Sequence, residues 1–287
     1  MSLYRQVRYR AARSRLQAPR TWVYHWGLRP KDVFLAAYPR SGSTWLRFML
    51  SEILTGHSAE FDNINEVIPE LRIHRMGSRI LPDGGRLVKT HAPYRKEYKK
   101  AIYLLRDVRD VVLSLYKRET ELHMLHGLYT NFDDYLLAFL QGETTHFGTW
   151  HHHVHSWLDS PLAKTDELLL IQFEDMRANT EKTLERIVEF LGVEADPRTI
   201  RDAVLNNSLE RMRAKEHRAR TTPKNTQVSW IGKGGCFVGK GSVGGWHGRL
   251  TGAQVQLIED YAGRELERLR YPTGPLAETP ILEQLRG

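Results

Sequence analysis

Short apolar runs alternate with longer amphipathic segments along the chain. The runs at 33–37, 101–105 and 167–173 are typical of strands buried in a parallel sheet, and 86–91 reads as a shorter strand. Apolar residues at helical spacing predict helices at 45–54, 108–116, 132–140, 149–158, 179–191, 198–205 and 251–270. Strands that alternate with helices favour an α/β fold, in which helices cover both faces of a parallel β-sheet.

The segments outside these elements suggest the domain limits. We expect a basic N-terminal arm at 1–29, one domain at 30–272 and a C-terminal tail at 273–287. Residues 56–85 are interrupted by Pro and Gly, which predicts irregular structure. The stretch 206–247 is polar, basic and Gly-rich. Because so long a loop in a compact domain is usually functional or disordered, we expect mobile lid loops here.

A loop of small residues follows the first strand. Pro39 stops that strand, Ser41 to Thr44 are small and mostly hydroxyl-bearing, and a helix pattern starts at Trp45. Strand, small-residue loop and helix start form the geometry that directs backbone N–H groups and a positive helix end at a phosphate. The G-x-x-x-x-G-K-[ST] nucleotide loop is absent, because Arg40 precedes the small residues and no Lys follows them. An ordinary strand-to-helix turn is the plain alternative.

The next two strands also end in polar residues. Lys89 and His91 stand at the end of the second strand, and Arg106 follows the third. Ligands of open α/β sheets bind at the carboxyl ends of the strands, so we expect these side chains to share one site with the small-residue loop.

The charge balance favours an anionic ligand or surface. Lys and Arg number 42 against 34 Asp and Glu, a net charge of +8. The first 20 residues hold six Arg and no acid, so the arm is either solvated or docks on a membrane or another acidic surface. We expect its Trp22, Tyr24 and Trp26 to pack on the domain, and we disfavour an organelle transit peptide because the arm lacks a clear apolar face. We expect no nucleic-acid partner.

Cysteine content and hydropathy point to a compartment. The single cysteine, Cys236, excludes an internal disulfide and fits a reducing environment. No apolar stretch is long enough to span a bilayer, and no secretory signal is visible. We therefore expect a cytoplasmic protein.

Five segments in order resemble the sulfotransferases that use 3′-phosphoadenosine 5′-phosphosulfate (PAPS), closer to their cytosolic branch and bacterial-like in character. They are Tyr38-Pro39-Arg40-Ser41-Gly42-Ser43-Thr44-Trp45, Lys89-Thr90-His91, Arg106 to Ser114, Phe173-Glu174-Asp175-Met176 and Lys240 to Trp246. The resemblance runs from about residue 33 to 246. It implies a single-domain fold similar to the P-loop NTPases, PAPS as co-substrate with adenosine 3′,5′-bisphosphate (PAP) as product, no metal, and a hydroxyl or amine acceptor that is a small molecule, lipid or saccharide.

The resemblance also implies roles for individual residues. His91 would be the general base, and Arg40 and Lys89 the cations at the bridging oxygen, with Ser114 beside them. The 5′-phosphosulfate would be held by Arg40, Ser41, Gly42, Ser43 and Thr44; the 3′-phosphate by Arg106, Ser114, Lys240 and Gly241; and adenine by Trp45, Phe173 and Ser208. For Trp45, core packing is an equal alternative. His153 would lie with His91 along the acceptor pocket, and His123, His126 and Tyr129 are further candidates there.

This chain departs from the family pattern at several positions. Arg40 replaces a lysine, Phe173 replaces a tyrosine, and Leu209 replaces an aromatic residue. Gly239 stands where the family has an arginine that contacts the 3′-phosphate. We consider the basic cluster Arg211–Arg220 as a compensating donor contact.

Three other interpretations stay open on the sequence. An inactive protein on the same fold that binds a nucleotide or an anionic polymer would retain most of these residues. A P-loop kinase is disfavoured because the GK[ST] motif and an evident magnesium carboxylate are missing. Zinc ligation by His151 and His155, an i, i+4 pair, is disfavoured because no Cys or Glu completes the set.

Overall fold

A parallel sheet forms the centre of the molecule. The computed structural model describes residues 18–125, 127–221 and 238–274. Its strands are β1 (Val33–Ala37), β2 (Leu87–Thr90), β3 (Lys100–Leu105) and β4 (Leu168–Gln172). They lie in the order β2-β1-β3-β4, and each neighbouring pair is parallel. The sequence-based prediction of a parallel α/β fold is therefore confirmed.

Helices connect the strands and continue beyond β4. They are α2 (Ala18–His25), α3 (Ser43–Thr55), α4 (Ile64–Val67), α5 (Val108–Glu121), α6 (Phe132–Leu140), α7 (Trp150–Leu158), α8 (Phe173–Ala178), α9 (Thr180–Phe190), α10 (Pro197–Asn206), α11 (Leu209–Thr221) and α12 (Gly252–Arg268), with 3₁₀ turns η2 (Leu71–Met76) and η3 (Pro161–Lys164). None of the helices in the described ranges combines the length and hydropathy needed to cross a membrane.

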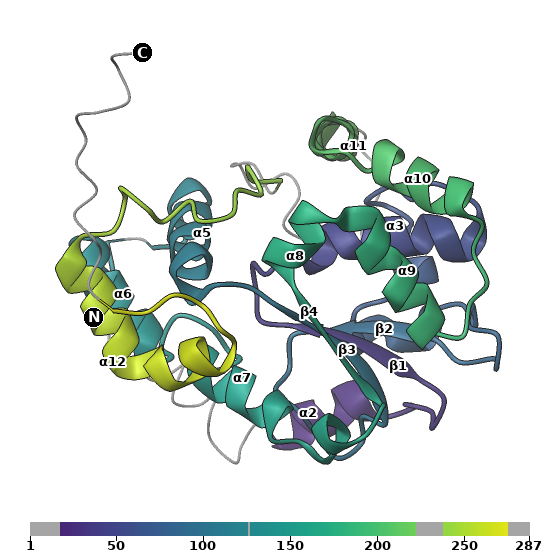
Figure 1. Cartoon of the computed structure of the whole chain (residues 1–287), viewed down its shortest axis with the longest axis horizontal. Helices are drawn as coiled ribbons and strands as arrows, with labels where there is room; N and C mark the ends of the chain where they lie inside the picture. The colour runs from purple at the N-terminus through teal and green to yellow at the C-terminus, as the bar shows by residue number, and fades with distance from the viewer. Residues whose placement is uncertain (1–17, 126, 222–237, 275–287) are drawn as a thin grey trace.

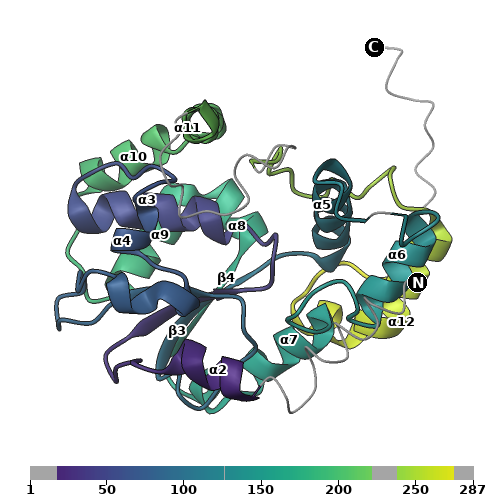
Figure 2. The ribbon, with the colours of Figure 1, turned by 180° about the vertical axis from the view of Figure 1, so that it is seen from behind.

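The two faces of the sheet bury different side chains of the same strand. In β1, Phe34 and Ala36 belong to one core cluster and Val33, Leu35 and Ala37 to the other. This follows from the two-residue period of a strand, and all five residues are buried because helices cover both faces. Figures 1 and 2 show α3, α8, α9 and α10 on one side and α5, α6, α7 and α12 on the other.

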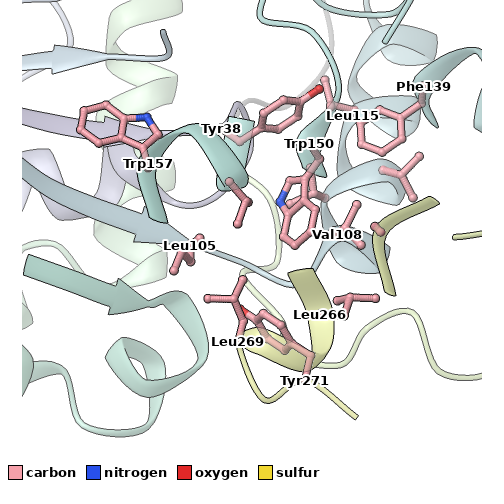
Figure 3. Close-up of a cluster of buried hydrophobic side chains, with 14 of the residues drawn as sticks. Tyr38, Leu105, Val108, Leu115, Phe139, Trp150, Trp157, Leu266, Leu269 and Tyr271 are labelled. Carbon is pink, nitrogen blue, oxygen red and sulfur yellow. The ribbon is translucent and has the colours of Figure 1, made fainter. Parts of the chain in front are cut away.

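The core cluster that contains Phe34 and Ala36 fixes α5, α6, α7 and α12 against one another. Figure 3 shows Trp150 from α7, Val108 and Leu115 from α5 and Leu266 from α12 gathered around a common centre. Burial of large side chains of this kind contributes about 1.5–3 kcal/mol each relative to exposure. The cluster therefore holds α5 rigidly beside the carboxyl end of β3, where the predicted site lies.

Four details differ from the sequence-based expectations. The strand β4 is partly exposed rather than buried, with Leu170 at 39% exposure, because it is an edge strand. The predicted long loop contains the helix α11, and short helical segments occur within 56–85. Trp22 and Trp26 pack on the domain less than expected: they stack on each other and are 66% and 58% exposed, and the guanidinium of Arg75 lies 4.5 Å from the ring centre of Trp26. The remainder of the predicted lid, 222–237, the tail from 275 and the arm before 18 lie outside the described residues, as do His126 and Cys236.

Candidate active site

Two residues in left-handed backbone conformation shape the small-residue loop. Arg40 has φ 72° and Gly42 φ 95°, and α3 starts directly after, at Ser43. Left-handed backbone is easy for glycine and costs other residues energy, so the chain reverses here in a few residues. The first N–H groups of α3 lack helical acceptors, as at every helix start. Ser43, Thr44 and Trp45 line a cavity, so this positive helix end faces it.

Gly42 also permits a close approach by Phe173. A Cβ at position 42 would lie 2.6 Å from Cδ2 of Phe173. We expect Gly42→Ala to displace this ring or the loop and to lower PAP affinity about tenfold, together with a loss of about 1–3 kcal/mol in unfolding free energy from the strained φ. Calorimetric titration and urea unfolding measure both. Gly56→Ala is the matched control for the strained φ, because Gly56 also has positive φ but open space around it; equal PAP affinities of the two variants would contradict the Phe173 contact.

The cavity collects most of the predicted site residues. It measures about 1330 Å³ and opens at the carboxyl ends of β1, β2 and β3. The predicted residues that line it are Arg40, Gly42, Ser43, Thr44, Trp45, Lys89, His91, Arg106, Ser114, Phe173, Lys240 and Gly241. Ser41, Ser208 and His153 are not among the lining residues.

His91 is held in a defined orientation at the end of β2. Its Nδ1–H donates to the carbonyl oxygen of Ala37, at 2.6 Å. A carbonyl can only accept, so the proton of the neutral ring sits on Nδ1 and the lone pair on Nε2. Burial and, next, the charge of Lys89 lower the pKa of His91 to about 3. The imidazole is therefore neutral at pH 7 and able to accept a proton at Nε2.

Lys89 lies two residues before His91 and is paired with Glu70. The Lys89 side chain is buried, and its Nζ lies 3.2 Å from Oε1 of Glu70. Burial lowers the pKa of Lys89, and the Glu70 carboxylate opposes that effect. In return, the lysine charge lowers the pKa of Glu70 to about 2. The pair keeps an ammonium group in the cavity wall beside the histidine.

Arg40 reaches from the small-residue loop to α5. Its Nε donates to Oγ of Ser114, at 2.9 Å. Burial, followed by the charges of Arg118 and Arg106, lowers the pKa of Arg40 to about 10, so the guanidinium stays charged at pH 7. Gly239 lies beside it, since a Cβ there would be in van der Waals contact with Nη2 of Arg40, at 3.8 Å. The positive charges of Arg40, Arg106 and Arg118 thus lie close together, and a bound anion would reduce the repulsion between them.

Arg106 clamps two segments of the site together. Its guanidinium donates to the carbonyl oxygens of Arg40 and Ser242, at 3.0 and 2.9 Å, and lies 3.6 Å from Asp110. It also stacks over the ring of Phe173, 4.5 Å from its centre. Arg106 is therefore at the site, although it contacts Asp110 as well. The neighbouring Arg109 is structural, because it is buried against Asp107 and Trp246.

Trp45 is anchored at the rim of the cavity. Its Nε1–H donates to the carbonyl of Asn207, at 2.7 Å, and its ring meets Phe173 edge-on. The guanidinium of Arg177 lies 5.1 Å from the ring centre. The indole thus both packs and borders the cavity, and adenine stacking stays a prediction.

His153 was predicted to line an acceptor pocket, but it does not line the cavity. It is fully buried beneath His91, where its Nε2–H donates to the His91 carbonyl at 3.1 Å and its Nδ1 accepts from Tyr103 at 2.8 Å. Burial lowers its pKa to about 4. Its place follows from α7, where 150, 153, 154 and 157 form one inward-facing helical stripe. His153 therefore braces the backbone of the predicted base.

Three further groups that were predicted to contact the donor lie outside the cavity lining. The hydroxyl of Ser41 is buried, and the hydroxyl of Ser208 accepts a long hydrogen bond from the N–H of Arg211, at 3.4 Å. The basic cluster on α11 does not line the cavity: Lys215 is buried against Asn207 and Ser58, Arg218 pairs with Glu60, and Arg220 pairs with Glu216. Tertiary contacts thus engage three of the charges that were considered to compensate for Gly239.

Sequence reasoning missed several lining residues. Glu70, Phe147, Tyr94 and Arg118 border the cavity, and the ring of Phe147 lies 5.5 Å from that of His91. Glu70 lies in a segment without a motif, and only its parallel bridge to Lys89 brings it into the site. The zinc hypothesis for His151 and His155 finds no support, because the described ranges hold no group of three potential metal ligands.

Comparisons with known proteins identify the family. The model of the sulfotransferase domain matches residues 30–270. Sulfotransferase 1A1 of Rattus norvegicus is 28% identical over 256 residues, covering 83% of this chain and 85% of that protein. Sulfotransferase 1E1 of Bos taurus is 29% identical over 239 residues, covering 78% and 79%.

Solved structures show the same fold. Retinol dehydratase in complex with androsterone and the inactive cofactor PAP aligns with a TM-score of 0.67 at 21% identity, covering 86% of this chain and 83% of that one. Mouse sulfotransferase SULT7A1 complexed with PAP aligns with a TM-score of 0.63 at 21% identity, covering 86% and 88%. The resemblance carried by the five segments is confirmed, and this chain belongs to the sulfotransferase family, whose general activity is sulfuryl transfer from PAPS.

Proposed function

We propose that this protein moves a sulfuryl group from PAPS to the hydroxyl, or amine, of a small-molecule acceptor, with His91 as the general base. One observation carries the proposal: a phosphate-type loop, the buried Lys89, the half-buried Arg40 and an oriented neutral imidazole converge on one cavity. These groups match the needs of sulfuryl transfer, in which positioning and charge stabilisation provide most of the catalysis, as in phosphoryl transfer.

The donor is assigned to the loop side of the cavity. The N–H groups at the start of α3 and the hydroxyls of Ser43 and Thr44 would hold the 5′-phosphosulfate. Ser114, Lys240 and the charge of Arg106 would recognise the 3′-phosphate, while Phe173 and Trp45 border the adenine. Arg106 plays a double part, because its donors already bind the carbonyls of Arg40 and Ser242 and so hold this pocket in shape.

The acceptor is assigned to the side of His91 and Phe147. The acceptor oxygen forms a bond to sulfur while the bond from sulfur to the phosphate oxygen breaks, and the acceptor proton passes to Nε2 of His91. Lys89 and Arg40 stabilise the negative charge that develops on the departing phosphate oxygen. The anionic donor raises the proton affinity of His91, which offsets the effects of burial and Lys89.

The size of the cavity fits two reactants. Its volume of about 1330 Å³ exceeds the roughly 300–1,000 Å³ of a pocket for one small ligand. Tyr24, His25, Leu71 and Tyr94 join Phe147 on its lining, giving aromatic surface with polar edges. This supports a small-molecule acceptor with both apolar and polar groups.

Nucleotide binding tests the donor assignment without knowledge of the acceptor. The wild-type protein should bind PAP in calorimetric titrations much more tightly than AMP, which lacks the 3′-phosphate. We expect Ser114→Ala to weaken PAP binding about tenfold or more through loss of a charge-assisted hydrogen bond, and to weaken AMP binding much less. Arg201→Ala on the exposed face of α10 is the control. Equal affinities of the wild type for PAP and AMP would overturn the assignment.

Turnover then separates two candidate functions. Transfer of radioactive sulfate from PAPS to a panel of phenols, sterols, amines and saccharides would support the enzyme. An inactive nucleotide- or anionic-polymer-binding protein is the second candidate, favoured by the low pKa of His91. Tight PAP binding without transfer to any acceptor would support that candidate instead.

The domain boundaries and the cellular location are also proposals. We propose an arm at 1–29, the catalytic domain at 30–272 and a tail at 273–287, which the family match over 30–270 supports. A cytoplasmic location is supported by the single cysteine. Docking of the basic arm on an acidic or membrane surface stays a prediction, and residues before 18 lie outside the described ranges.

A further inference from the structure

We propose that Glu70 is a positioning residue of the transfer reaction: its carboxylate fixes the Lys89 ammonium in the cavity wall and balances the positive charge that forms on His91. This inference rests on the proposed function and adds a residue that no motif in the sequence contains.

The backbone places Glu70 beside the catalytic strand. The N–H of Lys89 donates to the carbonyl of Pro69 at 2.9 Å, and Glu70 forms a parallel bridge to Lys89. Arg47, buried in α3, donates to the carbonyl of Ile68 and fixes the same segment from the other side. The carboxylate therefore has a defined place relative to β2, as a positioning residue requires.

The burial of Lys89 explains why a carboxylate is needed. An ammonium group removed from water is costly unless it is paired, and an unpaired one tends to lose its proton. Lys89 is 6% exposed, and Arg47, Arg72 and His91 are the other charged or titratable groups that face it. Of these neighbours only Glu70 is negative. Without it, Lys89 would stand among like charges and lose the proton with which it stabilises the leaving group.

Glu70 also acts on the base. Its negative charge raises the proton affinity of His91, opposing burial and Lys89. Its side chain is 30% exposed on the cavity side, so it is near the acceptor. When the acceptor proton reaches Nε2, a cation forms beside Lys89, and the carboxylate offsets the repulsion between them. The carboxylate thus stabilises a state that exists only during the reaction.

The test compares Glu70→Gln with wild type in PAPS-dependent transfer. Gln keeps the size of the side chain and removes the charge. We expect kcat at about pH 7.5 to fall on the order of tenfold or more, with a smaller change in the KM for PAPS. The alkaline limb of the pH–kcat profile should move to lower pH, because Lys89 loses its proton more easily once the raising influence of Glu70 is gone.

A second substitution isolates the lysine. Arginine stays protonated throughout the accessible range, so the alkaline limb should be insensitive to Glu70→Gln in a Lys89→Arg background. Glu70→Asp should restore part of the lost kcat. The control is Glu167→Gln, which removes a Lys–Glu pair with Lys100 at the opposite end of the sheet and outside the cavity.

The outcomes distinguish this inference from the proposed function. If the wild type binds PAP but transfers no sulfate, the proposed function fails first. If the wild type is active and Glu70→Gln has normal kcat and an unmoved alkaline limb, the role of Glu70 is refuted. A limb that moves equally in the Lys89→Arg background would also refute it. Should Glu70→Gln unfold, Glu70→Ala, which also removes the carboxylate, would refute the role of Glu70 if its PAP binding, kcat and alkaline limb were all unaltered.

Discussion

Replacing His91 by alanine should reduce sulfuryl transfer about 10²–10⁴-fold, the usual contribution of a positioned general base. The imidazole is oriented by the carbonyl of Ala37 and exposes Nε2 for the acceptor proton. PAP binding should survive, because the donor is assigned to the loop side of the cavity. The measurement is kcat for radioactive sulfate transfer together with calorimetric titration of PAP.

Two comparisons separate a base from a structural residue. His152→Ala removes an exposed histidine of α7 that does not line the cavity, and it should leave turnover unchanged. Imidazole added to His91→Ala should restore part of the rate, since it can enter the space left by the side chain and accept the proton. Near-normal turnover of His91→Ala would overturn the base assignment.

His153 should make the folded protein less stable in acid, and this is the second large effect that we expect. Burial lowers its pKa from the ordinary 6.5 to about 4, so the unfolded chain binds this proton more readily than the folded one. The associated stability is fully present above pH 6.5 and is lost as the pH falls towards 4. The difference corresponds to about 3 kcal/mol of unfolding free energy from this residue.

Urea unfolding of wild type and His153→Gln between pH 7.5 and 4 checks this expectation. Gln can donate to the His91 carbonyl but does not titrate, so the variant should lose less stability on acidification than the wild type. The comparison uses the slope of unfolding free energy against pH in each protein, because carboxylates that titrate in both proteins contribute equally to the two slopes. Parallel pH dependences for the two proteins would show that His153 does not carry the effect.

The positions of several strands and helices could be predicted from the pattern of neighbouring residues alone. The strand patterns at 33–37 and 101–105 and the helix patterns at 132–140 and 149–158 depend on the side-chain periods of strand and helix, which are properties of adjacent residues. The pattern at 167–173 predicted a strand but not its exposure, because whether a strand is central or at an edge depends on partners far along the chain.

The location of the site was predictable for a similar reason. Lys89 lies near the end of β2, His91 and Arg106 follow β2 and β3, and parallel strands bring their carboxyl ends to one edge. The prediction for His153 was wrong because its direction depends on which face of α7 meets the sheet. The basic cluster on α11 does not line the cavity, and its Lys215 and Arg218 have partners, Ser58 and Glu60, about 157 residues away; a donor contact by Arg211 or Arg213 stays a prediction.

The sequence by itself determined the parallel α/β architecture, the phosphate-type loop and the set of polar residues at the strand ends. Each of these follows from short-range periodicity or from a motif of adjacent residues. Only the tertiary structure decided that Glu70 pairs with Lys89, that Arg40 reaches Ser114, and that His153 lies behind His91. These contacts join residues that are distant in sequence, and their energies depend on burial, which no local pattern specifies.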